Sequence, residues 1–285
     1  MTNAKFESNR HRILRVQLYI EGHLDDELPL KRLAAVAHLS PYHFHRIFRA
    51  TVGEGVAEYV RRVRLEAAAI ALKATTDEVT KVAFNTGYGS HEAFTRAFRR
   101  RFGVSPSDFR SDHIANFKHK DSDMTSQTQE REICTAMLPA MRVAFLRHIG
   151  PYQESGATFQ KMMEWAFLKG LFNPQTKVLS ICHDDPEVTP TEKLRLDCCV
   201  TVDDSFTPEG EVEVQTIPDG EYVVLTHRGS YDGLADSYRW LYGEWLSTSA
   251  REFANRPPFE IYVNNPNDTS EDDLVTKICI LLQPT

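Results

Sequence analysis

"SPYHFHRIFRATVG" (residues 40–53) and "SHEAFTRAFRRRFG" (residues 90–103) are nearly the same short amphipathic segment, written twice at an offset of fifty residues. In each copy, aromatic residues recur four positions apart on one helical face, and arginines lie on another face. The matching pairs are Phe44 and Phe94, Arg46 and Arg96, Phe48 and Phe98, Arg49 and Arg99, Gly53 and Gly103, and Tyr59 and Phe109. Because packing positions and charged positions both agree, the pattern indicates a duplicated structural unit.

Each copy also has the pattern of a helix-turn-helix motif. A short helix at about 30–37 leads through a tight connection to Ser40, a favourable N-cap, and "VTKVAFNTGYGS" (79–90) supplies the same elements for the second copy. Between the copies, "EYVRRVRLEAAAIALK" predicts one long helix from about Glu58 to Lys73. Two recognition helices held about 34 Å apart would enter successive major grooves of DNA. One chain could then do what usually requires a dimer.

Charge is distributed unevenly along the chain. Residues 1–120 carry 20 Lys and Arg against 13 Asp and Glu, a net charge of +7, whereas residues 121–285 carry 13 against 27, a net charge of −14. A basic amino-terminal half is expected of a protein that binds nucleic acid. The acidic half would be repelled by phosphate and therefore needs a different task.

Apolar residues become scarce between Ser111 and Glu132, which predicts an all-α domain (8–112), a linker (113–131) and an α+β domain (132–285). No apolar run of about 18 residues is present, so no membrane-spanning helix is expected. The amino terminus does not resemble a signal peptide, and we expect a cytoplasmic, nucleoid-associated protein. The five cysteines lack metal-site spacing, so we expect no metal and no cofactor.

The acidic half is also written twice, because "LPAMRVAFLRHIGPYQ" (138–153) returns as "IPDGEYVVLTHRGSYD" (217–232). Each copy predicts a strand-helix-strand-strand module, and the two modules together predict an antiparallel sheet. The helical stripes expected to cover the sheet are Phe159, Met162, Met163, Ala166 and Phe167 in the first module, and Leu234, Tyr238, Leu241 and Trp245 in the second. Trp165 and Trp240 fall off these stripes, either as surface aromatics or as part of a recognition surface.

One acidic residue breaks the symmetry between the modules. In "RPPFEIYVNNP" (256–266), alternation puts Glu260 and Tyr262 on one face of a strand, while the position of Glu260 in the first module is Ser180. If that face meets solvent, Glu260 is an ordinary polar residue. If the modules close on each other there, Glu260 is a carboxylate in an aromatic cleft, which favours a cationic partner.

From about Ser8 to Arg110, the chain resembles the AraC/XylS family of bacterial transcription regulators. The segments that carry this resemblance are "LAAVAHLSPYHFHRIFRATVGEGVAEYVRRVRLEAA" and "VAFNTGYGSHEAFTRAFRRRFGVSPSDFR". The resemblance implies that each recognition helix presents side chains to base edges from its first turns. Carried over to this sequence, these are Tyr42, His45 and Arg46, and His91, Glu92, Thr95 and Arg96.

The chemistry of these residues leaves alternatives open. Arg46 and Arg96 could each fork onto guanine or clamp a phosphate. Glu92 could accept a hydrogen bond from cytosine or cap its own helix. The remaining arginines, for which a solvated basic face is the plain alternative, are expected to neutralise the DNA backbone; they are Arg49, Arg99, Arg100 and Arg101.

Residues 131–284 are similar to the GyrI-like small-molecule-binding domain through "HIGPYQ", "CHDDPEVTPTEKLRLDCCV", "GEYVVLTHRGSYDGL" and "PPFEIYVNNP". The resemblance implies a ligand held between the two modules, beside an acid on the strand that here carries Glu260. His183 stands where family members have an aromatic residue. The expected ligand-binding set is Glu260, Tyr262, Tyr152, Tyr231, Trp165, Trp240 and His183.

Together these patterns predict a transcription regulator, not an enzyme, that binds double-stranded promoter DNA as a monomer. Its carboxy-terminal domain would sense a small cationic or amphipathic effector, and RNA polymerase is a further candidate partner. Two alternatives stay open. The second domain could be a hydrolase in which Glu260 acts as general base near Tyr262, or it could be a protein-interaction module.

Overall fold

The computed structural model describes residues 2–120, 131–208 and 210–284, with the side chains of 2–8 and 114–120 left aside. The chain forms two compact units, a helical unit and a unit built around a sheet, and the main boundary between them falls between Ser111 and Asp112. The predicted linker, 113–131, begins inside a helix, since residues 113–120 belong to α7 (Pro106–Lys120). Residues 121–130 of that linker lie outside the described residues.

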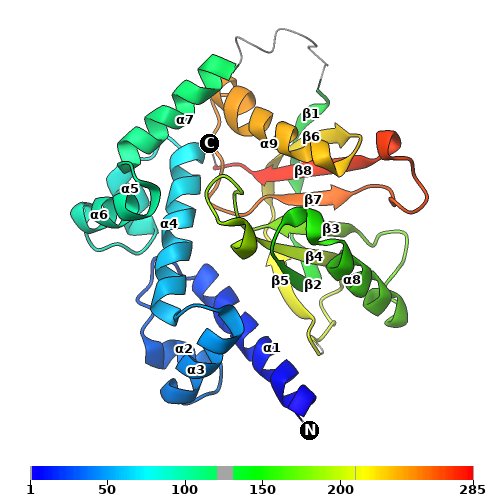
Figure 1. The fold of residues 1–285 in the computed structure, drawn as a ribbon. Coiled ribbons are helices and arrows are strands. Elements are labelled where there is room, and N and C mark those ends of the chain that lie inside the picture. Colours follow the sequence, from blue (N-terminus) through cyan, green and yellow to red (C-terminus); the bar gives the residue numbers. More distant parts are fainter. Residues whose placement is uncertain (1, 121–130, 209, 285) are drawn as a thin grey trace. The chain divides into compact units, whose positions relative to one another are not determined.

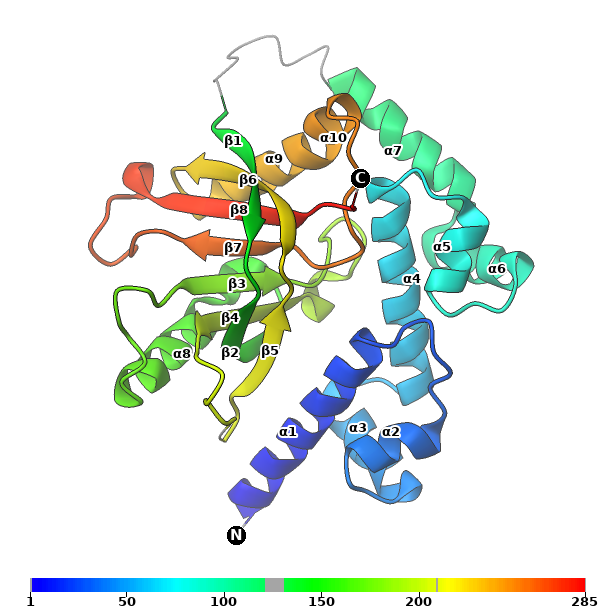
Figure 2. The same ribbon diagram turned by 180° about the vertical axis from the view of Figure 1, so that it is seen from behind.

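The helical unit contains two helix-turn-helix motifs at opposite ends of a long helix (Figures 1 and 2). The unit begins with α1 (Thr2–Glu21). The first motif follows and consists of α2 (Leu30–Val36) and α3 (Pro41–Val52). The second motif consists of α5 (Val79–Asn85) and α6 (His91–Phe102). The helix between the motifs, α4 (Val56–Ala74), confirms the long helix predicted from the sequence.

The two motifs are built by the same local chemistry. The Ser40 and Ser90 hydroxyl oxygens cap α3 and α6 by accepting the backbone N–H groups three residues later, at 3.4 and 3.2 Å. Both helices end at a glycine in the left-handed conformation, with φ of 80° at Gly53 and 82° at Gly103. The predicted duplication is therefore confirmed at both ends of each helix.

The buried faces of α3 and α6 match as well. Phe48 packs edge to face on Tyr59 with ring centroids 5.5 Å apart, and Phe98 packs in the same way on Phe109 at 5.3 Å. In the first motif, Phe48 belongs to a core that α1 completes with three fully buried aliphatic side chains, Ile13, Val16 and Ile20. The opposite faces of α3 and α6 are left exposed by this packing.

The second unit is an eight-stranded antiparallel sheet in the order β1-β6-β8-β7-β3-β4-β2-β5. Its strands are β1 (Ile133–Leu138), β2 (Met141–Ile149), β3 (Val178–Cys182), β4 (Arg195–Thr201), β5 (Glu213–Ile217), β6 (Gly220–Arg228), β7 (Phe259–Tyr262) and β8 (Val275–Leu281). The predicted modules are confirmed as β2-α8-β3-β4 and β6-α9-β7-β8. Each module also begins with a strand that the sequence analysis missed. These leading strands are exchanged, because β1 pairs with β6 of the second module and β5 pairs with β2 of the first.

The helices α8 (Gly156–Leu168) and α9 (Leu234–Trp240) cover the same face of the sheet, as both views show (Figures 1 and 2). A π-helical segment (Leu241–Trp245) and α10 (Leu246–Thr248) continue α9. The expected stripe of the second module is confirmed, since Leu241 is buried and its companions pack around it.

The stripe expected on α8 is only partly correct. Met162 and Ala166 are buried as predicted, but Phe167 is 75% exposed. The covered stripe is centred on Met162 and Ala166, so Phe167 falls beyond its edge at 100° per residue. Trp165, expected to lie off the stripe, packs instead against Phe206 with ring centroids 5.7 Å apart.

Candidate functional site

The expected DNA-contacting side chains lie on the outward faces of α3 and α6. Burial of the phenylalanines turns the other side of each helix to solvent, and Tyr42 is 66% exposed. The remaining exposed members of the predicted set are His45, Arg46, Arg49, His91, Glu92, Arg96, Arg99 and Arg100. Two matched basic faces are thus available at the two ends of α4.

Arg46 is already held in one orientation by its neighbour one turn earlier. Its guanidinium donates to the Tyr42 hydroxyl at 2.9 Å and lies 5.6 Å from the centre of the Tyr42 ring. The matching position beside Arg96 is Glu92. Hydrogen bonds from the Glu92 backbone N–H and from Ser90, and the nearby Arg96 charge, lower the pKa of the Glu92 carboxyl. Glu92 therefore accepts hydrogen bonds at the start of α6, whereas Tyr42, at the matching position of α3, holds Arg46.

Two residues of this region have different surroundings from those expected. Thr95 is only partly exposed, and its hydroxyl oxygen is buried with no hydrogen-bond partner among the described residues. Arg101, expected on the phosphate-neutralising face, pairs at 3.4 Å with Glu66 of α4, whose side chain is 1% exposed. Glu66 also pairs with Arg62 at 2.8 Å. Arg101 therefore joins α6 to α4 through a buried carboxylate, although its own side chain is still 32% exposed.

In the second unit, Glu260 lies at the centre of the sheet, where the two modules meet. Ser180 of β3 and Glu260 of β7 are direct partners in the antiparallel register, and they are also equivalent positions of the sequence repeat. The local two-fold axis of the repeat therefore passes between them. Glu260 is 5% exposed, so the symmetry-breaking carboxyl group is buried at the junction of the modules.

The groups that surround Glu260 are neutral hydrogen-bond donors. Its carboxylate accepts from the Tyr262 hydroxyl at 2.9 Å and from the Ser180 hydroxyl at 3.3 Å, and the Cys182 thiol approaches at 3.7 Å. Within the described parts of the chain, no lysine or arginine pairs with Glu260. A buried carboxylate without a counter-ion favours a cationic partner.

Aromatic rings complete these surroundings. The Tyr262 ring meets Phe159 of α8 at 5.4 Å and Tyr231 at 5.5 Å, both edge to face. Burial, and then the Glu260 charge, raise the pKa of both Tyr262 and Tyr231, so these hydroxyls stay protonated and can donate. Glu260, Tyr262 and Tyr231 thus come together as the ligand set expected.

The other expected ligand residues lie elsewhere. The Tyr152 hydroxyl donates to the Asp184 carbonyl oxygen at 2.7 Å, which ties a loop to the sheet. Trp165 packs on Phe206, and Trp240 lies under the Arg131 guanidinium at 5.1 Å. Both tryptophan rings therefore already have partners within the protein.

His183 belongs to a separate cluster that the sequence analysis missed. It bonds the Asp197 carboxylate at 2.6 Å, and Arg147 binds the same carboxylate with two hydrogen bonds of 2.7 and 3.0 Å. Gln215 of the exchanged strand β5 adds a bond of 2.7 Å. Since the Cys182 thiol points to Glu260, the next residue in the extended chain points to the opposite face, which corrects the expectation for His183.

Asp197 is fully buried, and its charge is balanced by Arg147. Burial alone would raise the pKa of the Asp197 carboxyl, but Arg147 and His183 hold it well below its usual range. The sequence did carry a signal for this cluster, since the charged residues Arg147 and Asp197 each directly follow or precede apolar residues within the strands "RVAFLRHI" and "LRLDCCVTV". Among the described residues, no group of three His, Cys, Asp or Glu side chains is arranged to hold a metal ion.

Comparison with known proteins identifies the family. Residues 132–283 match the family described as the GyrI-like small molecule binding domain, and residues 33–112 match a helix-turn-helix domain family. The regulatory protein SoxS of Salmonella typhimurium is 35% identical over 92 residues, which cover 32% of this chain and 86% of SoxS. The chain belongs to the AraC family and carries a GyrI-like domain. This confirms the family recognised from the sequence.

Other relatives of this AraC-family protein are similar over only part of their length. The right origin-binding protein of Escherichia coli K12 is 36% identical over 93 residues, which cover 33% of this chain and 32% of that protein. The alignment thus spans about a third of such curated relatives.

Among solved structures, the C-terminal domain of EcmrR matches with 19% identity, a TM-score of 0.45, and coverage of 55% of this chain and 100% of that chain. EcmrR in a DNA complex has 15% identity and a TM-score of 0.47, and the match covers 90% of this chain and 99% of that chain.

Of the helices described in this AraC-family protein, none has the length and apolar character needed to cross a membrane.

Proposed function

We propose that this protein is a single-chain transcription regulator that binds two adjacent major grooves of promoter DNA and responds to a small cationic effector. Tyr42, His45 and Arg46 of α3 and His91, Glu92 and Arg96 of α6 would meet base edges. Arg49, Arg99 and Arg100 would neutralise phosphates. Thr95 would contribute through its methyl group, because its hydroxyl oxygen is buried.

The observation that carries this proposal is the matched exposure of two arginine-bearing helix faces on one continuous α4. Both helices have the same cap, the same buried phenylalanines and the same left-handed glycine end, so they present the same kind of surface. A protein with one functional motif would not need the second face to remain basic and exposed. Two such faces on one chain fit one DNA duplex that has two half-sites.

The effector part of the proposal rests on Glu260. A cation that reached this carboxylate would replace a buried, unpaired charge with an ion pair, and the rings of Tyr262 and Tyr231 would add cation–π attraction. The neutral surroundings of Glu260 favour a singly charged organic cation over a metal ion, since hydroxyl, thiol and aromatic groups are weak metal ligands here.

The test of the DNA part is a selection of bound duplexes from a random pool by the full-length protein. We expect enrichment of a bipartite motif whose half-sites are about 10 base pairs apart. The Arg46→Ala and Arg96→Ala variants should each lose preference within a different half-site. Recovery of a single half-site, or of no motif, would contradict the two-groove arrangement.

The test of the effector part uses a quaternary ammonium ion and its neutral carbon isostere as probes. Calorimetry should detect binding of the cation and weaker or absent binding of the isostere. Transcription in vitro with purified RNA polymerase, from a promoter that carries the selected motif, would show whether the polymerase is a partner and whether the cation changes the output. Hydrolysis of a quaternary ammonium probe that carries an ester group would instead favour the hydrolase alternative.

A further inference from the structure

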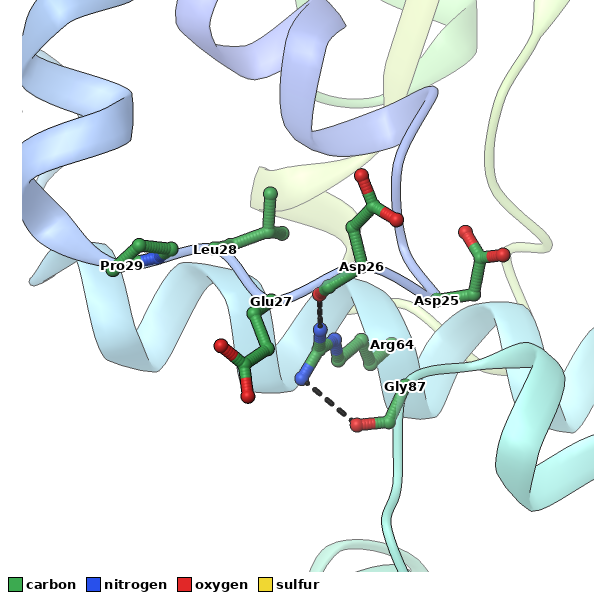
Figure 3. Close-up of a pocket in the computed structure, with 7 residues that line it drawn as sticks. All are labelled: Asp25, Asp26, Glu27, Leu28, Pro29, Arg64 and Gly87. Atoms are coloured by element: carbon green, nitrogen blue, oxygen red, sulfur yellow. Dashed lines mark hydrogen bonds between the residues drawn. The ribbon is translucent and has the colours of Figure 1, made fainter.

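Arg64 joins three segments of the helical unit that are far apart in sequence. It projects from the middle of α4 between the α1–α2 loop and the α5–α6 turn, as Figure 3 shows. One of its terminal nitrogens donates to the Asp26 carbonyl oxygen at 2.6 Å, and the other donates to the Gly87 carbonyl oxygen at 3.1 Å. A single guanidinium thus binds a loop of the first helix-turn-helix unit and the turn of the second.

The α5–α6 turn of the second helix-turn-helix motif is shaped to accept this arginine. Gly87 has a φ of 77°, and a Cβ atom at this position would lie 2.5 Å from the Arg64 Cζ and 2.2 Å from the Leu24 carbonyl oxygen. Both distances are far below contact, so a residue with a side chain would force the loop, the turn and the guanidinium apart. In the first unit, the matching turn carries His38, which has a φ of 52°. The close approach of the turn to Arg64 is therefore a feature of the second helix-turn-helix motif.

The position of this contact bears on how two grooves are read. Because α4 is a continuous helix, it sets the distance between the two units along its own axis. The second helix-turn-helix motif, however, joins α4 through the short segment between Ala74 and Val79. Such a short connection leaves the rotation of this motif about α4 to be set by other contacts. The Arg64 bonds act on that rotation together with the Arg101–Glu66 pair, because they tie the α5–α6 turn to the α1–α2 loop beside the first helix-turn-helix motif.

We infer that Arg64 is a positioning residue that sets the angle between α3 and α6, and thereby the half-site spacing that the protein accepts. The inference rests on the proposed two-groove function. It assigns no DNA contact to Arg64, whose two terminal nitrogens each donate to a backbone carbonyl oxygen. Arg64 would instead limit which duplexes can engage both recognition helices at once.

The test compares the full-length protein with its Arg64→Met variant on three duplexes. The first has the selected spacing, the second has one base pair inserted between the half-sites, and the third has one half-site scrambled. Met keeps the apolar stem of the side chain and removes both donors. Arg61→Met is the matched control, because Arg61 is exposed on the same helix and its loss changes the net charge equally.

We expect the inserted base pair to weaken binding of the wild-type protein and of Arg61→Met by about tenfold or more, since one helix then misses its half-site. For Arg64→Met, we expect about tenfold weaker binding to the selected duplex, an insertion penalty below about threefold, and unchanged affinity for the scrambled duplex. An insertion penalty equal to that of the wild type would overturn the inference. A uniform loss of affinity on all three duplexes would also overturn it.

A second variant covers the case in which Arg64→Met does not fold, as judged by circular dichroism. Arg64→Lys keeps the charge, and its single ammonium can reach one carbonyl oxygen but not hold both in a fixed fork. We expect it to show an insertion penalty between those of Arg64→Met and the wild type, and a wild-type penalty would refute the role of the fork. A wild-type protein that selects no duplex would count against the proposed function itself.

Discussion

Replacing Arg46 by alanine tests whether the first recognition helix reads bases. The guanidinium is exposed and has one hydrogen bond, to the Tyr42 hydroxyl, so removing it leaves no buried partner unsatisfied. The fold should therefore stay intact, and the whole effect should appear in binding. A two-pronged contact to guanine contributes about 1–3 kcal/mol, which corresponds to an affinity loss of about 5- to 150-fold.

The Tyr42 contact refines this magnitude. An arginine side chain loses up to about 2 kcal/mol of rotamer entropy when it is held in one conformation. Because Tyr42 already restrains Arg46, part of that loss is present before DNA binds. The Arg46→Ala effect should then lie in the upper half of the range, and Tyr42→Phe should cost about 0.5–1 kcal/mol through the lost restraint alone.

The assay is fluorescence anisotropy with the selected duplex and with single base-pair changes in it, at several salt concentrations. Arg46→Ala should relax the preference at one base pair and leave the salt dependence nearly unchanged. Arg49→Ala is the matched control, because Arg49 lies one turn further along α3 and is expected at a phosphate. It should weaken all duplexes equally and reduce the salt slope by about 0.9. If Arg46→Ala behaves in the same way, the base-reading role is refuted.

Three further substitutions test the remaining features. Glu260→Gln removes a charge without changing shape, and calorimetry should show about tenfold or greater loss of affinity for a quaternary ammonium ion, with unchanged DNA affinity. Equal affinity for the cation would remove Glu260 from the site. Asp197→Asn leaves Arg147 buried without its carboxylate partner, and should lower the free energy of unfolding by about 3–5 kcal/mol at pH 7 in urea. Because folding lowers the pKa of Asp197, its charge stabilises the fold above about pH 4, and the difference between variant and wild type should shrink as the pH falls below that value. His38→Gly relieves a left-handed backbone with φ of 52°, and should raise the unfolding free energy by up to about 1 kcal/mol; a clear loss in the same urea measurement would show that the His38 side chain contributes more than its backbone costs.

The helical unit was largely predictable because its determinants are local. Helical periodicity identified Phe44 and Phe48 as core residues, and Ser40 and Gly53 marked the two ends of α3. These signals act within one or two turns of helix, so they can be read along the chain. The pairing of Arg101 with Glu66 could not be read in this way, because the two residues are 35 positions apart and either one could have remained solvated.

The second unit shows the limit more clearly. The repeat revealed two modules and the unmatched Glu260, but strand alternation alone did not say which strands would pair. The exchange of β1 and β5 between modules is a long-range choice, since a strand edge is satisfied by any partner of suitable register.

By itself, the sequence determined the duplicated helix-turn-helix plan, the division into basic and acidic halves, and the carboxylate that breaks the second repeat. Only the tertiary structure decided that Glu260 faces Ser180 across the centre of the sheet, that His183 lies on the opposite face with Asp197, and that Arg64 ties the two helix-turn-helix motifs together. The physical reason is the range of the forces involved. Periodicity and capping are set by neighbours in the chain, whereas buried charges and backbone carbonyl groups find their partners only when distant segments are packed together.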